Sequence, residues 1–139
     1  MQVRQPWMKF GTDAEGLDPD SATSTTHPRS YGTYPRILGR FVRDDGVLRL
    51  EDAVRKMTSA VAERLSIRDR GLLREGLHAD IVVFDPATII DYATYEKPHQ
   101  LSTGVQWVFV NGAAVVADGK VTGAKPGRIV RGPGWRGTE

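Results

Sequence analysis

The dipeptide Asn111-Gly112 stands between two apolar runs, residues 105–110 and residues 113–117. An Asn-Gly pair in this setting is a strong short-range signal for a β-hairpin, because both residues readily adopt the positive φ of a two-residue turn. A further apolar run, residues 80–84, is rich in β-branched side chains and reads as a buried strand. The second half of the chain is therefore predicted to form a small antiparallel β unit.

The first half of the chain is predicted to contain one strand, one long loop and two helices. Residues 3–12 are predicted to be a short strand, and the polar residues 14–33 a long loop. Pro35 suits the first turn of a helix that ends near Asp44. A second helix is predicted over residues 50–65, followed by a return to strand-like patterns.

The apolar spacing of this second helix predicts which of its faces is buried. Leu50, Val54, Met57 and Val61 recur at i, i+4, i+7 and i+11, which places them on one stripe. Thr58 opens a Thr-Ser pair that can break the segment into two shorter helices. We therefore expect this stripe to pack against the core.

These elements define an α+β fold class and three segments. Residues 1–66 hold the strand, loop and helices, and residues 67–132 hold the antiparallel β unit. Residues 133–139 are rich in Gly and Arg and are predicted to be a flexible tail.

The composition argues against several classes of function and of partner. Nineteen Lys and Arg against seventeen Asp and Glu give a formal net charge of +2 at pH 7, and the basic residues are scattered, so no nucleic-acid partner is expected. The absence of cysteine excludes a disulfide framework and thiolate chemistry, and we expect a cytoplasmic protein. No apolar run reaches the roughly twenty residues of a membrane helix, so no membrane partner is expected either.

Asp13 is the candidate catalytic residue. A short apolar stretch ends in Gly11-Thr-Asp13, and a polar loop follows. In parallel-sheet enzymes the reactive side chains stand at the carboxyl ends of strands, where the following loop opens a crevice. The same tripeptide is also typical of a simple turn in which Asp bonds its own backbone. The residues alone leave both interpretations open.

Several motifs follow one another in a fixed order between about residue 7 and residue 132. They are Gly11-Thr-Asp13, His27-Pro-Arg-Ser-Tyr-Gly-Thr-Tyr-Pro-Arg36, Leu38-Gly39, Glu51-Asp-Ala-Val-Arg-Lys-Met-Thr-Ser59, Asp69-Arg-Gly71, Glu75-Gly76, Ala79-Asp-Ile-Val-Val-Phe-Asp-Pro86, Pro98-His-Gln100 and Val110-Asn-Gly112. Together they resemble the C-terminal part of an amidohydrolase-superfamily enzyme, and most closely the N-acyl-D-amino-acid deacylases, or D-aminoacylases. The block over residues 27–36 narrows the resemblance to that group.

The resemblance implies a fold and a reaction. Enzymes of that family carry a catalytic metal, usually zinc, on a (β/α)8 barrel, and a carboxylate at the end of the eighth strand acts on the metal-bound water. Asp13 matches this carboxylate and is also a candidate metal ligand, together with donors from an N-terminal half. The first segment would then be the last strand and helices of such a barrel, and the β unit half of a composite β-sandwich. The implied reaction is hydrolysis of the amide bond of N-acyl-D-amino acids.

Arg29 and His27 are the candidate substrate-binding residues, because they lie in the loop that would overhang such a site. The Arg29 guanidinium can bind a substrate carboxylate through two parallel hydrogen bonds, and it can equally bond the loop to its own backbone. The aromatic ring of Tyr31 is more typical of core packing. His78 and His99 are predicted to be packing or surface residues.

The metal ligands of the family lie in earlier barrel strands and are not among these motifs. The three histidines, at positions 27, 78 and 99, lack paired spacing, whereas catalytic zinc needs about three protein ligands. We therefore expect no zinc to be bound by this chain alone. Apolar faces shaped to meet a barrel predict self-association or association with an N-terminal barrel half. The alternative function is a non-catalytic remnant that acts as a small binding or assembly module.

Overall fold

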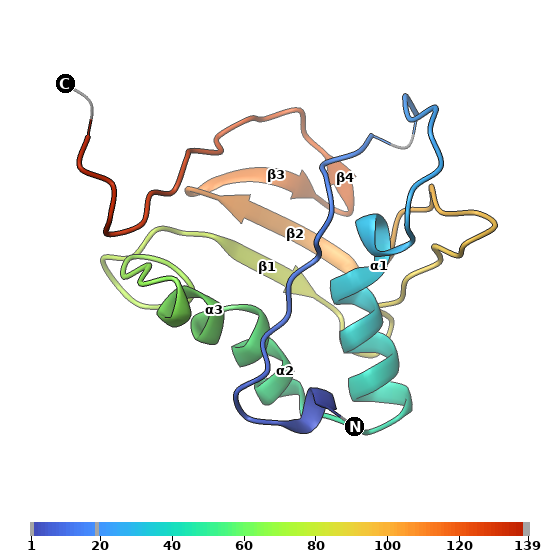
Figure 1. Ribbon diagram of the computed structural model, residues 1–139. Helices are drawn as coiled ribbons and strands as arrows, with labels where there is room; N and C mark the ends of the chain where they lie inside the picture. Colours follow the sequence, from blue (N-terminus) through green and yellow to red (C-terminus); the bar gives the residue numbers. More distant parts are fainter. Residues whose placement is uncertain (1, 19, 138–139) are drawn as a thin grey trace.

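The computed structural model describes residues 2–18 and 20–137. Helices gather at one side of a four-stranded antiparallel sheet, and the N-terminal segment runs between them in the view of Figure 1. The elements are η1 (Gln2–Arg4), α1 (Arg29–Arg36), η2 (Ile37–Asp44), α2 (Leu50–Met57), α3 (Ser59–Arg64), β1 (Ile81–Phe84), β2 (Val105–Val110), β3 (Ala113–Ala117) and β4 (Lys120–Val121). The predicted α+β class is confirmed.

The predicted hairpin forms the centre of the sheet. Strands β2 and β3 pair antiparallel, with Val110 opposite Ala113 across the turn. Asn111 and Gly112 have φ values of 48° and 82°, as a two-residue turn of this kind requires. The strand predicted over residues 80–84 is β1, which pairs antiparallel with β2, and β4 pairs with the other edge of β3. Its predicted burial is wrong in part, because β1 is an edge strand and its Val82 and Val83 side chains are exposed.

A polar network fixes the hairpin turn to the preceding chain. The Asp80 carboxylate accepts a hydrogen bond from the Asn111 backbone N–H (2.8 Å) and forms an ion pair with Arg70. Arg70 also donates to the Asn111 side-chain oxygen (2.6 Å). Burial acts to raise the pKa of Asp80, but the hydrogen bonds from Asn111 and Arg70 outweigh it and hold that pKa below the usual value of 3.8.

Stability is expected to depend on the charge of Asp80. Because the folded pKa lies below the unfolded one, the stabilisation is complete above about pH 4 and is lost as the pH falls through the folded pKa. Asp80→Asn is expected to lower the unfolding free energy at pH 6 by about 1 kcal/mol, a modest value because solvent screens a carboxylate with 34% of its side chain exposed. Urea unfolding at pH 6 and pH 3 measures the difference.

The matched control is Glu63→Gln, which removes one exposed negative charge from α3. Its effect on stability is expected to be small at both pH values. A loss for Asp80→Asn that is as large at pH 3 as at pH 6 would contradict the proposed role of the charge.

The predicted strand over residues 3–12 is wrong for this chain. Residues Gln2–Arg4 form a short 3-10 helix, and residues 8–18 have no regular secondary structure. The Phe10 backbone N–H donates to the Lys56 carbonyl (3.2 Å), so this segment binds a helix instead of a strand. Within the described ranges no strand lies beside it, and a lone strand has no ladder of hydrogen bonds to stabilise it.

The first helix begins earlier than predicted. Helix α1 starts at Arg29, so Pro35 lies in its last turn and the predicted loop ends at Pro28. The chain continues without interruption as η2, a π-helix that ends at Asp44 as predicted. Proline lacks a backbone N–H, so the hydrogen bond that it would donate in a regular helix is missing next to this change of helix type.

The second predicted helix is broken at Thr58, as the Thr-Ser pair allowed, into α2 and α3. The predicted buried stripe is wrong in part, because Val54 is exposed while Ala53 and Lys56 are fully buried. The N-terminal segment covers that face. Lys56 Nζ donates to the Val3 carbonyl (2.6 Å) and forms an ion pair with Asp52 Oδ2 (3.0 Å), and together these partners satisfy the buried ammonium.

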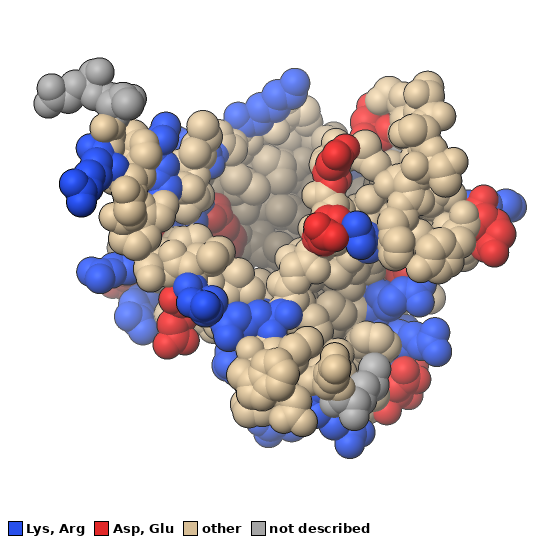
Figure 2. Space-filling view, in the orientation of Figure 1, with Lys and Arg blue, Asp and Glu red and all other residues tan. Residues whose placement is uncertain are grey.

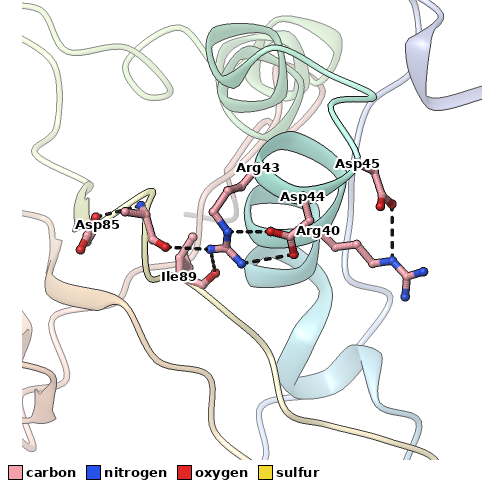
Figure 3. A network of polar contacts seen from close by, with 7 residues as sticks. Arg40, Arg43, Asp44, Asp45, Asp85 and Ile89 are labelled. Carbon is pink, nitrogen blue, oxygen red and sulfur yellow. Dashed lines mark hydrogen bonds and ion pairs between the residues drawn. The ribbon is translucent and has the colours of Figure 1, made fainter.

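The core lies where η2, α2 and the segment after β1 meet. Its buried members are Ile37, Leu38, Leu48, Ala53 and Ile89. Figure 3 shows how Arg43 reaches from η2 to the chain around Ile89 and donates to the Ile89 carbonyl (2.7 Å). The same guanidinium pairs with Asp44 (2.8 Å). This contact holds the Ile89 segment against the helix.

The division of the chain at residues 66 and 67 and the flexible tail stay predictions. Residues 1 and 19 of the first predicted segment, and residues 138–139 of the tail, lie outside the described residues. No helix in the described ranges is long and apolar enough to cross a membrane.

Candidate functional site

Asp13 lies in an exposed turn next to the start of α1. Its φ of 47° is in the left-handed region, which aspartate tolerates better than most residues. Its carboxylate oxygen Oδ2 is 2.9 Å from Arg29 Nη2, and 86% of its side chain is exposed. The positive φ agrees with the simple-turn interpretation, but in the described residues the Asp13 carboxylate contacts Arg29 and accepts no hydrogen bond from its own backbone. The exposed carboxylate beside an arginine fits the catalytic interpretation.

Arg29 connects this carboxylate to a cavity of about 480 Å³ between α1 and residues 93–96. Apolar side chains of the lining are Phe10, Ile37, Phe41 and Ala93, and polar ones are His27, Arg29, Thr33, Arg36, Thr94, Tyr95 and Glu96. A mainly apolar cavity with a few convergent polar groups is typical of a small-molecule site. Arg29 and Arg36 bring guanidinium groups to this lining and Glu96 brings a carboxylate, and a guanidinium with unused N–H donors can bind an anionic group.

His27 lies between Arg29 and the opposite wall of the cavity. Its Nδ1 accepts a hydrogen bond from the Arg29 backbone N–H (3.0 Å), and its Nε2 is 3.0 Å from the Tyr95 hydroxyl. The two rings meet edge to face, with centroids 5.1 Å apart. The structure therefore brings the predicted residues Asp13, His27 and Arg29 to one place.

A second contact fixes the far wall of the cavity. Arg36 Nε and Nη2 both donate to Asp91 Oδ2, at 3.0 and 2.7 Å, and the Asp91 side chain is 8% exposed. A Cβ at Gly32 would lie 2.7 Å from this same oxygen, so only glycine leaves room for the pair. The segment that carries Tyr95 is thereby held against α1.

The other two histidines lie away from Asp13. His99 bonds to Tyr31 Oη (3.0 Å) and to the Ser24 carbonyl (2.9 Å), and His78 lies 3.4 Å from Asp69. Local sequence reasoning did not single out Tyr95, which reaches His27 across 68 residues of chain. No local pattern marked this tyrosine as a site residue.

Residues 8–121 match the model of the amidohydrolase family. This chain belongs to the amidohydrolase family. The resemblance inferred from its motifs is thus confirmed, and the match includes Asp13, Arg29 and Tyr95.

Individual relatives show which enzymes of this family the chain resembles. The amidohydrolase chain is 43% identical over 126 residues to N-acyl-D-aspartate deacylase and 44% identical over 123 residues to D-aminoacylase, both of Alcaligenes xylosoxydans xylosoxydans. These matches cover 90% and 88% of this chain but 24% and 25% of the relatives. The chain therefore spans about a quarter of the length of the curated relatives that it matches.

Solved structures of D-amino-acid deacylases also match part of this chain. A crystal structure of D-aminoacylase matches 72% of this amidohydrolase chain with 48% identity and a TM-score of 0.70, over 21% of that enzyme. N-acyl-D-glutamate deacylase from Bordetella bronchiseptica, in complex with zinc and a phosphonate inhibitor, matches 86% with 41% identity and a TM-score of 0.73, over 25% of its chain. The helices and sheet thus match part of the D-aminoacylase structure.

These relatives bind metal ions: the N-acyl-D-glutamate deacylase structure contains zinc, and a binuclear metal centre has been described in D-aminoacylase. In residues 2–18 and 20–137 of the amidohydrolase chain, no three His, Cys, Asp or Glu side chains gather as a metal site requires. The neighbour of Asp13 is instead a guanidinium cation. This part of the chain does not fit zinc by itself.

Proposed function

We propose that this chain is the C-terminal segment of a metal-dependent amidohydrolase that hydrolyses the amide bond of N-acyl-D-amino acids. The observation that carries the proposal is the exposed Asp13 carboxylate, held 2.9 Å from an arginine that lines a cavity. The similarity to three deacylases of N-acyl-D-amino acids supports the substrate class. The chain covers only part of those enzymes, so the rest of the site comes from elsewhere.

Asp13 is the proton-transfer group in this proposal. Its carboxylate accepts a proton from the water that attacks the amide carbonyl carbon, and it returns that proton to the nitrogen that leaves. Its exposure gives water access to both oxygens. Arg29 restricts the position of the carboxylate, as accurate proton transfer requires.

Arg29 is the group that binds the carboxylate of the substrate. A guanidinium has five N–H donors, and the contact with Asp13 uses only Nη2. The remaining donors can bind a second carboxylate on the cavity side, where the apolar lining accepts the uncharged part of the substrate. In this proposal the scissile amide lies between the bound carboxylate and Asp13.

We further propose that the first segment completes a barrel and that the sheet is half of a composite sandwich. Residues 8–12 of the predicted strand would then form a strand once a neighbouring strand supplies a ladder, and an N-terminal half would supply the metal ligands and bind zinc. Figure 2 shows a hollow with uncharged residues on its floor, between the C-terminal segment and the loop that precedes α1, and a partner can fill this surface. Val82, Val83 and Val121 on the strands are also exposed.

The test is reconstitution with an N-terminal barrel half of a deacylase in the presence of zinc. Sedimentation measures complex formation, and release of the free amino acid measures hydrolysis of an N-acyl-D-amino acid, with the L enantiomer as control. We expect a complex that hydrolyses the D substrate. A complex that forms without hydrolysis would contradict the enzymatic proposal and favour a non-catalytic assembly module.

Arg29→Gln is expected to raise KM in the reconstituted enzyme by about 10- to 100-fold, since charge-assisted hydrogen bonds contribute about 1.5–3 kcal/mol. Steady-state kinetics measure this effect. Arg40→Gln is the matched control, because Arg40 is exposed on η2 and pairs with Asp45. A substrate analogue whose carboxylate is replaced by a carboxamide is expected to be insensitive to Arg29→Gln. An equal effect on that analogue would show that Arg29 does not bind the carboxylate.

A further inference from the structure

Two histidine–tyrosine contacts join the loop before α1, and α1 itself, to the segment that contains residues 95–99. His27 meets Tyr95 and His99 meets Tyr31, each with 3.0 Å between the ring nitrogen and the hydroxyl oxygen. Both pairs are edge to face, with interplanar angles of 79° and 80°. The two contacts have similar geometry. Each imidazole also makes a second hydrogen bond, and these second bonds imply that the imidazole is the donor in one pair and the tyrosine hydroxyl is the donor in the other.

In the first pair, the imidazole is the donor. The Arg29 backbone N–H points at His27 Nδ1 (3.0 Å), and because an N–H can only donate, Nδ1 carries no proton. The ring is therefore neutral, with its proton on Nε2, and Nε2–H donates to the Tyr95 oxygen. The hydroxyl hydrogen of Tyr95 is not used in this contact.

In the second pair, the tyrosine is the donor. His99 Nε2 faces the Ser24 carbonyl oxygen (2.9 Å), and because a carbonyl can only accept, Nε2 carries the proton. In the neutral ring Nδ1 is then an acceptor, and the Tyr31 hydroxyl donates to it. The hydroxyl hydrogen of Tyr31 is used in this internal hydrogen bond, so the pair has a structural role.

We propose that the Tyr95 hydroxyl is a second substrate-binding donor, which gives its hydrogen to the substrate carboxylate that Arg29 binds. This inference rests on the proposed deacylase function. Tyr95 and Arg29 line the same cavity, and the Tyr95 side chain is exposed, so a ligand can reach its hydroxyl. Within residues 2–18 and 20–137 the hydroxyl makes its one hydrogen bond with His27.

His27 couples the two donors. Its ring bonds the backbone N–H of Arg29 on one side and the hydroxyl of Tyr95 on the other, so one imidazole joins the first residue of α1 to the Tyr95 hydroxyl. The hydrogen bond that Tyr95 accepts from Nε2–H also polarises its O–H bond and strengthens it as a donor. A carboxylate has two oxygens, so one can accept from the guanidinium and the other from the phenol. His27 is thus a positioning residue.

The test uses Tyr95→Phe with Tyr31→Phe as the matched control in the reconstituted complex. Tyr95→Phe is expected to raise KM for an N-acyl-D-amino acid about 10-fold, the effect of one hydrogen bond to a charged group, with kcat changed much less. Tyr31→Phe is expected to lower stability and leave KM unchanged. An unchanged KM for Tyr95→Phe in a complex that hydrolyses substrate would overturn this inference alone. If the wild-type complex forms but does not hydrolyse substrate, the proposed function is contradicted, and the inference that rests on it is contradicted too.

A second measurement tests the proton assignment on this chain without activity. The ¹⁵N shifts of the His27 and His99 rings report which nitrogen carries the proton, and both are expected to carry it on Nε2 at neutral pH. Circular dichroism verifies that each variant folds. A His27 proton on Nδ1 would overturn the inference, because Tyr95 would then be the donor to the ring and have no hydrogen left for a substrate.

Discussion

Asp13→Asn is expected to lower kcat of the reconstituted enzyme by about 10²- to 10⁴-fold, the usual contribution of general acid–base catalysis. Asparagine keeps the size and shape of the side chain but cannot accept the proton of the attacking water. Substrate binding through Arg29 is retained, so KM is expected to change little. Steady-state hydrolysis of an N-acyl-D-amino acid measures both constants.

The fold is expected to tolerate this change. The side chain of Asp13 is 86% exposed, and an exposed ion pair contributes little to stability, about 0–1 kcal/mol. Asparagine is also among the residues that adopt positive φ readily, so the turn at φ 47° is not strained by the substitution. A loss of activity with unchanged unfolding would therefore report on chemistry.

Glu15→Gln is the matched control for Asp13→Asn. It removes the same charge from an exposed residue of the same loop, two positions further along the chain. Activity close to that of the wild type is expected. If Glu15→Gln lowered kcat as much as Asp13→Asn, the effect would belong to the charge of the loop, and Asp13 would not be the proton acceptor.

Gly104→Ala is expected to cause the largest loss of stability among the single substitutions considered, about 2–5 kcal/mol. A Cβ at this position would lie 2.4 Å from Ile89 Cα and 2.7 Å from Ile89 N, and the backbone has a φ of 92°. Ile89 is 1% exposed and belongs to the core, so it cannot move away without opening a cavity. Urea unfolding followed by circular dichroism measures the change.

Gly112→Ala separates the two causes of this loss. Gly112 has a similar φ of 82°, but nothing lies within 4 Å of the added Cβ. Its substitution therefore introduces backbone strain alone, about 1–2 kcal/mol. Equal effects of the two substitutions would contradict the close approach of Gly104 to the core and would assign the whole loss to backbone conformation.

The elements that sequence reasoning predicted correctly depend on near neighbours in the chain. The Asn111-Gly112 turn selects its own backbone conformation, and the apolar runs on either side need only each other to pair. The break at Thr58 is equally local. The order of the motifs was enough to recognise the amidohydrolase family. The roles that it suggested for Asp13, His27 and Arg29 stay predictions, although the structure brings these three residues into contact.

The errors concern residues whose environment comes from distant parts of the chain. Residues 3–12 have the composition of a strand, but a strand forms only where another supplies a ladder, and in the described chain a helix carbonyl takes that place. Lys56 is buried because its ammonium group pairs with Asp52 on the same helix and donates to the distant Val3 carbonyl, and helical periodicity does not reveal the second contact. Helix α1 begins before Pro35 and has Tyr31 and Arg36 bound by His99 and Asp91.

The sequence by itself determined the hairpin, the helix break and the family, because each depends on contacts over a few positions or on the order of short motifs. Tertiary structure alone decided that Tyr95 meets His27 across 68 residues and which of their atoms holds the proton. The physical reason is that a hydrogen bond between distant segments depends on how the chain folds back on itself, and local propensity carries no information about that path.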